Sequence, residues 1–264
     1  MCTPSPSGPK MVSTLENDPR KRFSRRAEYY SRYRPSYPKS LLRYLKEDLC
    51  FSQASVVADV GSGTGILSKL LLENGNRVFG VEPNDDMRRT AEANLARYPN
   101  YKSIGGSAES TTLGNESVDF ITAAQSFHWF NPEQAKTEFR RVLRREGWVV
   151  LIWNTRRTST PFLQAYDALV SWIPDNQRAR HEDLGDQALR SFLGDYRAVK
   201  LDNSQELDYD GMVGRLLSSS YAPLRGEPLF DDMITKVSDL FNRYQVDGVV
   251  TLDYVTEVYA GQLF

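Results

Sequence analysis

Residues 56–153 alternate short apolar runs with helical patterns, and this alternation constrains the fold more than any other feature of the chain. Runs rich in β-branched residues predict strands at 56–60, 78–82, 101–104, 118–124 and 148–153. Apolar residues at helical spacing lie between the strands, and N-capping asparagines predict helices that begin after Asn84 and Asn131. Strands that alternate with helices form a mostly parallel sheet covered on both faces. The predicted fold class is therefore α/β, with a doubly wound Rossmann-like sheet.

The regions on either side of this core do not show its regular alternation of strand and helix patterns. Apolar residues at helical spacing predict helices over 41–49, 162–170 and 230–244, and alternation over 249–261 predicts a last strand, which we expect to be antiparallel. We therefore divide the chain into a disordered tail at 1–20, an N-terminal helical lid at 21–50, an α/β core at 51–155, and a C-terminal part at 156–264 in which cap helices accompany the last strands of the sheet.

The composition excludes several classes of protein. The 264 residues include 33 Lys and Arg against 34 Asp and Glu, so the net charge is −1, whereas blanket binding of nucleic acid requires a large positive excess. Two cysteines and two histidines argue against a disulfide framework and against a metal cluster, so we expect no metal. No apolar run reaches the length of about 18 residues that spans a membrane. We expect a globular, cytoplasmic protein.

A glycine-rich turn, DVGSGTG at 59–65, leads from the first predicted strand directly into a helix. Glycines let such a turn approach a ligand closely, and the start of a helix favours an anionic group. The dinucleotide fingerprint G-x-G-x-x-G is broken, because Ile66 stands at its third glycine and Asp59 would face a pyrophosphate. Glu82 ends the second strand, 21 residues after Gly61, where a carboxylate can accept hydrogen bonds from both ribose hydroxyls. The two carboxylates favour an adenosine that carries an amino acid.

Four segments resemble a known family in their order and spacing: VADVGSGTG (57–65), VEPNDDMR (81–88), GSAEST (106–111) and AAQSFHWF (123–130). They look like the cofactor motifs of class I methyltransferases, within the broad group that includes trans-aconitate methyltransferase and quinone-biosynthesis C-methyltransferases. The resemblance covers about residues 23–155. Three further segments resemble a subset of that group: RYRPSYP (32–38), GRLLSSSYAP (214–223) and YVTEVYAG (254–261). The resemblance implies that S-adenosylmethionine is the cofactor, that residues 51–155 are its binding core, and that the methyl acceptor is a small molecule.

The resemblance also implies roles for individual residues. Gly61 and Gly63 receive the methionine part of the cofactor, and Asp59 holds either the turn or the cofactor's amino group. Glu82 clasps the ribose. Met87 could instead be a core residue, and Glu109 could instead face water. The remaining cofactor positions are Asn84 and Met87 against the ribose and adenine face, Ser107, Ala108 and Glu109 at the adenine edge, Gln125 beside the sulfonium, and Tyr33 with Arg34 closing over the cofactor, where Arg34 reaches its carboxylate.

The methyl acceptor decides whether a base is needed. A hydroxyl must lose its proton, a carboxylate needs no base, and a carbon acceptor loses a proton during or after attack. His128 is the only histidine near the expected site, so we predict it as the catalytic base; the alternative is a histidine that fixes its loop. Arg156 with Arg157 would suit an acidic acceptor, unless both face water. The predicted acceptor pocket consists of Trp129, Phe130, Trp153, Asn154 and Arg156.

Other functions stay open beside a small-molecule methyltransferase. The alternative of an RNA or protein methyltransferase depends on the basic, tyrosine-rich stretch 20–34. This stretch can equally be a solvated helix packed on the domain or a lid over the cofactor. A non-methylating S-adenosylmethionine-binding protein needs only the cofactor residues. A dehydrogenase is disfavoured by the glycine spacing. We expect neither a nucleic-acid partner nor a membrane partner.

Overall fold

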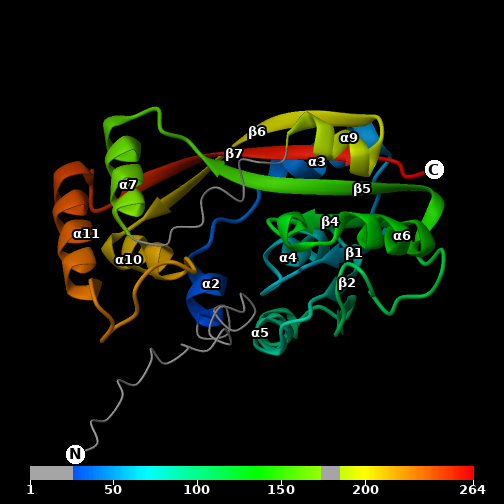
Figure 1. Cartoon of the computed structure of the whole chain (residues 1–264), viewed down its shortest axis with the longest axis horizontal. Coiled ribbons are helices and arrows are strands. Elements are labelled where there is room, and N and C mark those ends of the chain that lie inside the picture. The colour runs from blue at the N-terminus through cyan, green and yellow to red at the C-terminus, as the bar shows by residue number, and fades with distance from the viewer. Residues whose placement is uncertain (1–25, 174–184) are drawn as a thin grey trace, which may run out of the picture.

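A computed structural model describes residues 26–173 and 185–264. The tail predicted at 1–20 lies outside these residues, as does the beginning of the basic stretch 20–34. Seven strands form one sheet, with the order β3-β2-β1-β4-β5-β7-β6 (Figure 1). The strands are β1 (Val56–Val60), β2 (Arg77–Val81), β3 (Tyr101–Ile104), β4 (Val118–Ala124), β5 (Leu143–Arg156), β6 (Tyr196–Leu207) and β7 (Val250–Gly261).

The sheet has the predicted doubly wound topology. β1 is parallel to β2 and β4, β2 is parallel to β3, and β4 is parallel to β5. β7 is antiparallel to both of its neighbours, β5 and β6, which confirms the antiparallel C-terminal strand. The strand order reverses between β1 and β4. In sheets of this kind the ligand binds at the carboxyl ends of the strands beside such a reversal.

Helices cover both faces of the sheet. α3 (Lys39–Leu49) and α4 (Ile66–Glu73) bury leucines against one face, while α6 (Pro132–Val142) and α9 (Asp186–Leu193) bury Phe139 and Phe192 against the other. α5 (Asp85–Leu95) follows β2, and the predicted N-caps of α5 and α6 are confirmed. In residues 26–173 and 185–264, none of the helices combines the length and the apolarity needed to cross a bilayer.

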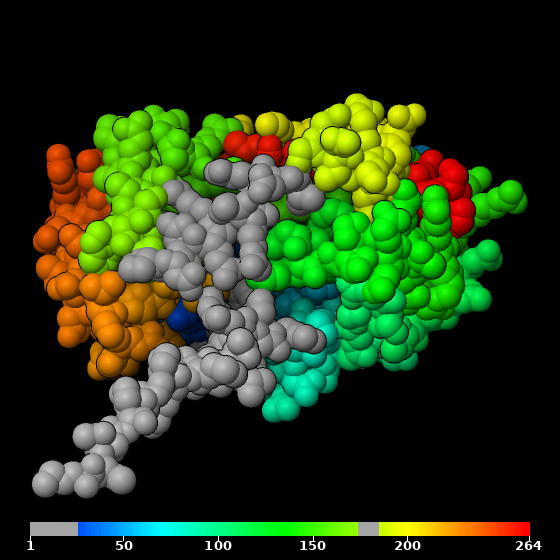
Figure 2. Space-filling model, viewed as in Figure 1, coloured from blue at the N-terminus to red at the C-terminus, as the bar shows by residue number. Residues whose placement is uncertain are grey.

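A second group of helices forms a cap at one end of the long strands. α7 (Pro161–Trp172), α10 (Tyr209–Leu217) and α11 (Phe230–Tyr244) gather there, at the left in Figure 1. They bury Tyr166, Met212 and Val237 together with residues from the adjoining ends of β6 and β7. Figure 2 shows α10 and α11, in orange, at the end of the molecule opposite the C-terminus. β5 runs toward the cap and is parallel to β4, so the cap lies at the carboxyl edge of the parallel strands.

β6 is the element that the sequence pattern does not reveal. Its sequence, YRAVKLDNSQEL, is mostly polar, and its side chains are half-buried or exposed up to Leu207. It lies at the edge of the sheet and pairs along its whole length with β7 alone. An edge strand with one partner needs little apolar surface, so its sequence lacks the apolar run that marks a central strand.

α2 (Ala27–Tyr33) links the cap to the core. Asn94 of α5 donates to the Ser31 hydroxyl of α2 at 2.6 Å and to the Thr64 carbonyl in the glycine-rich turn at 3.4 Å. On the other side the Tyr33 ring covers Gly214 of α10, where an added Cβ would lie 2.3 Å from the ring. The helix ends before Pro35, as predicted, because Arg34 is already extended. α2 therefore sits between cap and core at the carboxyl edge (Figure 1).

Candidate functional site

The loops after β1, β2 and β4 meet at the carboxyl edge of the sheet. The Gly61 N–H in the glycine-rich turn donates to the Val81 carbonyl of β2 at 2.8 Å. Gly61 has a φ of +68°, and a Cβ there would lie 2.5 Å from the Cβ of Ser126 in the loop after β4. A positive φ with so close a neighbour requires glycine. Gly63 is also at positive φ, but an added Cβ there would meet only the Met87 methyl, at 3.5 Å.

Glu82 is buried directly after β2 and joins two of these loops. Its Oε2 accepts a hydrogen bond from the Gly63 N–H at 2.9 Å, and its Oε1 accepts one from the Asn84 N–H at 2.9 Å. Burial raises the pKa of this carboxyl, and the two backbone N–H groups partly oppose the rise. A carboxylate offers about four lone-pair sites, so two stay available for hydroxyl groups of a ligand.

Asp59 is buried in β1 and is held by two hydroxyls. Its Oδ1 accepts from Thr122 of β4 at 2.9 Å, and its Oδ2 accepts from Ser68 of α4 at 2.6 Å. Burial raises its pKa to about 6, although hydrogen bonds from Ser68 and Thr122 act in the other direction. The carboxylate thus braces the β1–α4 turn against β4. This geometry supports a role of Asp59 in holding the turn rather than in binding the amino group of a cofactor.

The raised pKa of Asp59 predicts a pH-dependent stability. Because the folded-state pKa, about 6, exceeds the usual 3.8, folding takes up a proton between these values, and the free energy of unfolding decreases as pH rises through them. Asp59→Asn cannot ionise. The stability of the wild type relative to this variant should therefore fall by up to about 3 kcal/mol between about pH 4 and about pH 7.

Urea unfolding across this pH range measures the difference. Asp202→Asn is the control, because that carboxyl has 90% of its side chain exposed. A difference between wild type and Asp59→Asn that does not change with pH would contradict the raised pKa.

Asn84 and Met87 belong to the start of α5. The Asn84 Oδ1 accepts from the N–H groups of Asp86 and Met87, both at 3.0 Å, so its side chain caps the helix. Met87 is buried, with its methyl beside Gly63. Met87 is thus a packed residue, and it packs on the glycine-rich turn.

The loop after β3 contains Ser107, Ala108 and Glu109. Ser107 forms a short antiparallel bridge with Ser110. Ala108 is buried in the core. Glu109 accepts from the Asn131 N–H at 2.8 Å. Burial raises the pKa of Glu109, but hydrogen bonds from Asn131 and Ser107 outweigh it, and the net pKa is lowered. Glu109 therefore ties this loop to the start of α6.

The loop after β4 lies over the glycine-rich turn. Gln125, at a φ of +56°, donates through Nε2 to the Asn154 carbonyl at 3.1 Å. A short 3₁₀ helix, Phe127–Trp129, follows. The half-buried His128 ring lies 4.8 Å from the Trp129 ring, and Trp129 is 40% exposed. Phe130 is half-buried and lies 3.6 Å from the Cβ position of Gly61. Phe130 thus lies beside the glycine-rich turn, and His128 and Trp129 belong to the same loop.

The three acceptor residues predicted from the end of β5 are engaged elsewhere. Trp153 is buried in the aromatic core, edge-on to Phe127 at 6.3 Å, and does not line an open rim. Asn154 bonds the Ser36 carbonyl at 3.2 Å and the Thr256 hydroxyl at 2.6 Å. Arg156 pairs with Asp167 at 2.9 Å and lies over the Tyr166 ring. Arg157 pairs with Asp202. Both arginines are thus paired with carboxylates of the chain, which disfavours an acidic-substrate site at Arg156 and Arg157.

Arg34 is turned toward the cap. Its Nη2 donates to the Ser218 carbonyl at 3.1 Å, and its guanidinium stacks over the Tyr30 ring, 4.9 Å from the centroid. Tyr33 contacts α10 through its ring and accepts from Gln205 through its carbonyl at 2.9 Å.

Arg215 is a residue that the sequence did not single out. It is buried close to Arg34, and its only sequence signal was the resemblance over 214–223.

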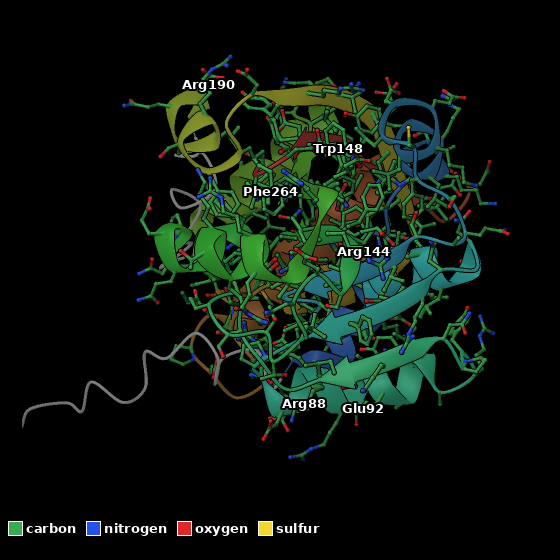
Figure 3. All side chains as sticks on the ribbon, turned by 90° about the vertical axis from the view of Figure 1, so that its right-hand side faces the viewer. Arg88, Glu92, Arg144, Trp148, Arg190 and Phe264 are labelled. Carbon is green, nitrogen blue, oxygen red and sulfur yellow. The ribbon has the colours of Figure 1, made fainter. Side chains whose placement is uncertain are left out.

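A cavity of about 530 Å³ lies at the other end of the molecule. Trp148 and Phe264, which line it, are on the face that Figure 3 shows, away from the cap. None of the predicted site residues lines this cavity. The loops at the carboxyl edge therefore stay the candidate site.

Comparisons with known proteins identify the core. Residues 58–151 match the family described as Methyltransferase domain. An uncharacterized methyltransferase of Mycobacterium tuberculosis is 39% identical over 127 residues, which is 48% of this chain and 49% of that protein. An uncharacterized methyltransferase-like protein of Schizosaccharomyces pombe is 30% identical over 136 residues, 51% of this chain and 52% of that protein. The chain spans about half the length of the curated relatives it matches.

Solved structures share the fold. A candidate type II methyltransferase from Anaeromyxobacter dehalogenans superposes with a TM-score of 0.66 at 23% identity, over 88% of this chain and 99% of that one. A SAM-dependent methyltransferase from Geobacter sulfurreducens, solved with S-adenosyl-L-homocysteine, gives a TM-score of 0.50 at 16% identity, over 90% and 96%. With the motifs at the carboxyl edge, the conclusion is that residues 58–151 of this chain are a methyltransferase domain and that the chain has the fold of S-adenosylmethionine-dependent methyltransferases.

Proposed function

We propose that the protein transfers the methyl group of S-adenosylmethionine to a small-molecule acceptor. Glu82 is the observation that carries this proposal. It is a buried carboxylate after β2, held toward the β1 turn by the N–H groups of Gly63 and Asn84, with lone pairs to spare. A ribose diol offers two hydroxyl donors to such a carboxylate. The solved SAM-dependent methyltransferase from Geobacter sulfurreducens, which holds S-adenosyl-L-homocysteine, supports the same donor.

The residues at the turn fit the rest of this cofactor. Gly61 and Gly63 keep the backbone bare, and Met87 presents a polarizable thioether beside them, suited to an aromatic base. When bound, the cofactor supplies an electrophilic methyl group on a sulfonium. The chain's own residues then have two tasks: holding the acceptor in line, and keeping water away from the reacting atoms. Phe130 of the loop after β4, which lies 3.6 Å from the Cβ position of Gly61, supports a role in the second task.

The described part of the basic stretch favours a small acceptor over a nucleic acid. Two of its three arginines donate to carbonyls of the turn after α10, Arg26 to Ser219 and Ala222, and Arg34 to Ser218, while the third, Arg32, is exposed. Arginines used for packing in this way offer little to a phosphate backbone, whose binding depends on accessible positive charge.

The direct test combines cofactor binding with methyl transfer. Calorimetry should detect binding of S-adenosylmethionine, and a radiolabelled methyl group should pass to members of a panel of small-molecule acids, phenols and quinone precursors. Binding without transfer to any acceptor class would favour the non-methylating alternative. Salt-dependent binding of RNA together with labelling of RNA would overturn the small-molecule proposal.

His128 is predicted to act as the base when the acceptor must lose a proton. With such an acceptor, His128→Ala should lower kcat by about 100-fold or more, because a positioned base contributes about that much. Affinity for S-adenosylmethionine should stay unchanged. His128→Gln keeps hydrogen-bonding capacity without a comparable base, and it should lose as much activity as alanine. Near-normal turnover of the glutamine variant would assign His128 a loop-fixing role instead.

A further inference from the structure

Three segments far apart in the sequence meet beneath the cap. Arg34 comes from the chain after α2, Arg215 with Ser218 and Ser219 comes from α10 and its C-terminal turn, and Tyr254 comes from β7. The Nε of Arg215 donates to the Tyr254 hydroxyl at 3.2 Å, and Arg34 donates to the Ser218 carbonyl at 3.1 Å. These are the segments 32–38, 214–223 and 254–261 that stood out beside the four cofactor motifs. We call this group the arginine cluster.

Among the described residues, no carboxylate neutralises the two positive charges of the arginine cluster. Arg215 is 6% exposed, and its hydrogen bonds go to hydroxyls: Tyr254, and, at 3.4–3.5 Å, Ser218 and Ser219. Within residues 26–173 and 185–264, neither Arg215 nor Arg34 forms an ion pair, in contrast to Arg156 with Asp167. The Nε of Arg34 is buried and has no hydrogen-bond partner. Buried cations are costly unless an anion accompanies them.

Burial lowers the pKa of Arg215, but Tyr254, Tyr166 and Tyr221 outweigh it and the net pKa is raised, so tyrosines stand where a carboxylate would. Burial and the charge of Arg215 lower the pKa of Arg34. Burial raises the pKa of Tyr221, but Arg215, a hydrogen bond from Ser219, and Arg34 outweigh it, so this phenol's pKa is lowered. An anion placed among these side chains would relieve the repulsion between the two guanidiniums and gain charge-assisted hydrogen bonds from both.

The arginine cluster adjoins the cofactor site. Tyr37, three residues after Arg34, is close enough to both Asp59 and Arg34 for their charges to act on its pKa in opposite directions, although burial is the main cause of its rise. Ser36 accepts from Asn154, whose own carbonyl accepts from Gln125 of the loop after β4. The chain at 34–37 therefore connects the cluster to the ends of β1, β4 and β5.

We propose that the methyl acceptor carries a carboxylate, which the guanidiniums of Arg215 and Arg34 bind beneath the cap. This inference rests on the proposed methyltransferase function. It concerns recognition of the acceptor: the carboxylate anchors the molecule, and tyrosines 166, 221 and 254 around it provide an apolar and hydrogen-bonding wall. The cluster takes the place of Arg156 and Arg157 as the acid-recognition site.

Matched acids and amides test the proposal in the full-length protein. With S-adenosyl-L-homocysteine present, calorimetry should show phenylacetate and hexanoate binding at least tenfold tighter than phenylacetamide and hexanamide. Arg215→Met should reduce the acid affinity at least tenfold, and Arg215→Lys, which keeps the charge but loses the planar fork, should fall between. Arg225→Met, at an exposed arginine of the cap, is the matched control and should bind like the wild type.

S-adenosylmethionine affinity separates the two proposals. It should be unchanged in Arg215→Met, whose fold circular dichroism checks. If Arg215→Met does not fold, Tyr221→Phe, a milder change beside the arginine cluster, replaces it and should also lower the acid affinity. Equal binding of acids and amides by the wild type, or unaltered acid affinity in a folded Arg215 variant, would overturn the carboxylate proposal. Loss of S-adenosylmethionine binding with intact acid binding would instead assign the cluster to the cofactor's own carboxylate and also overturn it. Failure of the wild type to bind S-adenosylmethionine would contradict the proposed function instead.

Discussion

Replacing Glu82 with alanine should weaken the binding of S-adenosylmethionine by at least about 100-fold. The variant loses a charged acceptor for two ribose hydroxyls, and a hydrogen bond to a charged group contributes about 1.5 to 3 kcal/mol. It also frees the N–H groups of Gly63 and Asn84, which Glu82 now holds at 2.9 Å, so the turn loses a fixed position. Calorimetry on the folded variant measures the effect.

Two further variants distinguish charge from shape at this position. Glu82→Gln has nearly the same size, but its amide NH₂ would face one of the two backbone N–H donors, so it should rescue little affinity. Glu92→Ala removes an exposed carboxylate from α5, the helix that follows Glu82 in the chain (Figure 3), and should bind like the wild type. Affinity within a few-fold of wild type for Glu82→Ala would exclude Glu82 from the ribose site.

The core could be predicted from sequence because its elements are buried on both sides. The bounds of β1, β3 and β4 agree with the predicted strands at 56–60, 101–104 and 118–124. β6 could not be predicted, because an edge strand paired only with β7 carries polar side chains along most of its length. β5 extends beyond the predicted 148–153 at both ends, and the added residues are mostly polar.

The sequence predicted those parts of the candidate site whose position follows from the direction of the parallel strands. Residues that follow parallel strands meet at one edge, so Glu82 and the glycine-rich turn could be brought together from sequence. Contacts between side chains of elements that are far apart in the sequence could not be predicted in this way. The N-cap at Asn84 could be predicted, but the pairing of Arg156 with Asp167, although it joins residues only 11 apart, was not distinguished from a ligand contact. Arg215 approaches Arg34 from nearly 200 residues away, and no sequence pattern encodes that meeting.

Gly61→Ala should destabilise the protein and weaken cofactor binding together. A non-glycine residue in the left-handed region costs about 1 to 2 kcal/mol, and the Cβ at 2.5 Å from that of Ser126 adds overpacking of about 1 to 3 kcal/mol. Gly248→Ala is the matched control for the cost of a positive φ alone, because the φ of Gly248 is +82° and nothing lies within 4 Å of the added Cβ. Urea unfolding should therefore show the larger loss for Gly61→Ala.

A double-mutant cycle separates the two terms at Gly61. Ser126→Gly removes the colliding side chain but also its hydrogen bond to the Val60 carbonyl at 2.9 Å, so alone it should cost stability. In Gly61→Ala/Ser126→Gly the overpacking disappears and only the backbone strain persists, so the double variant should be more stable than the sum of the single losses predicts, by about 1 to 3 kcal/mol. Strictly additive losses would mean that the turn after β1 does not press against the loop after β4. The close approach of those loops, on which the whole site depends, would then be contradicted.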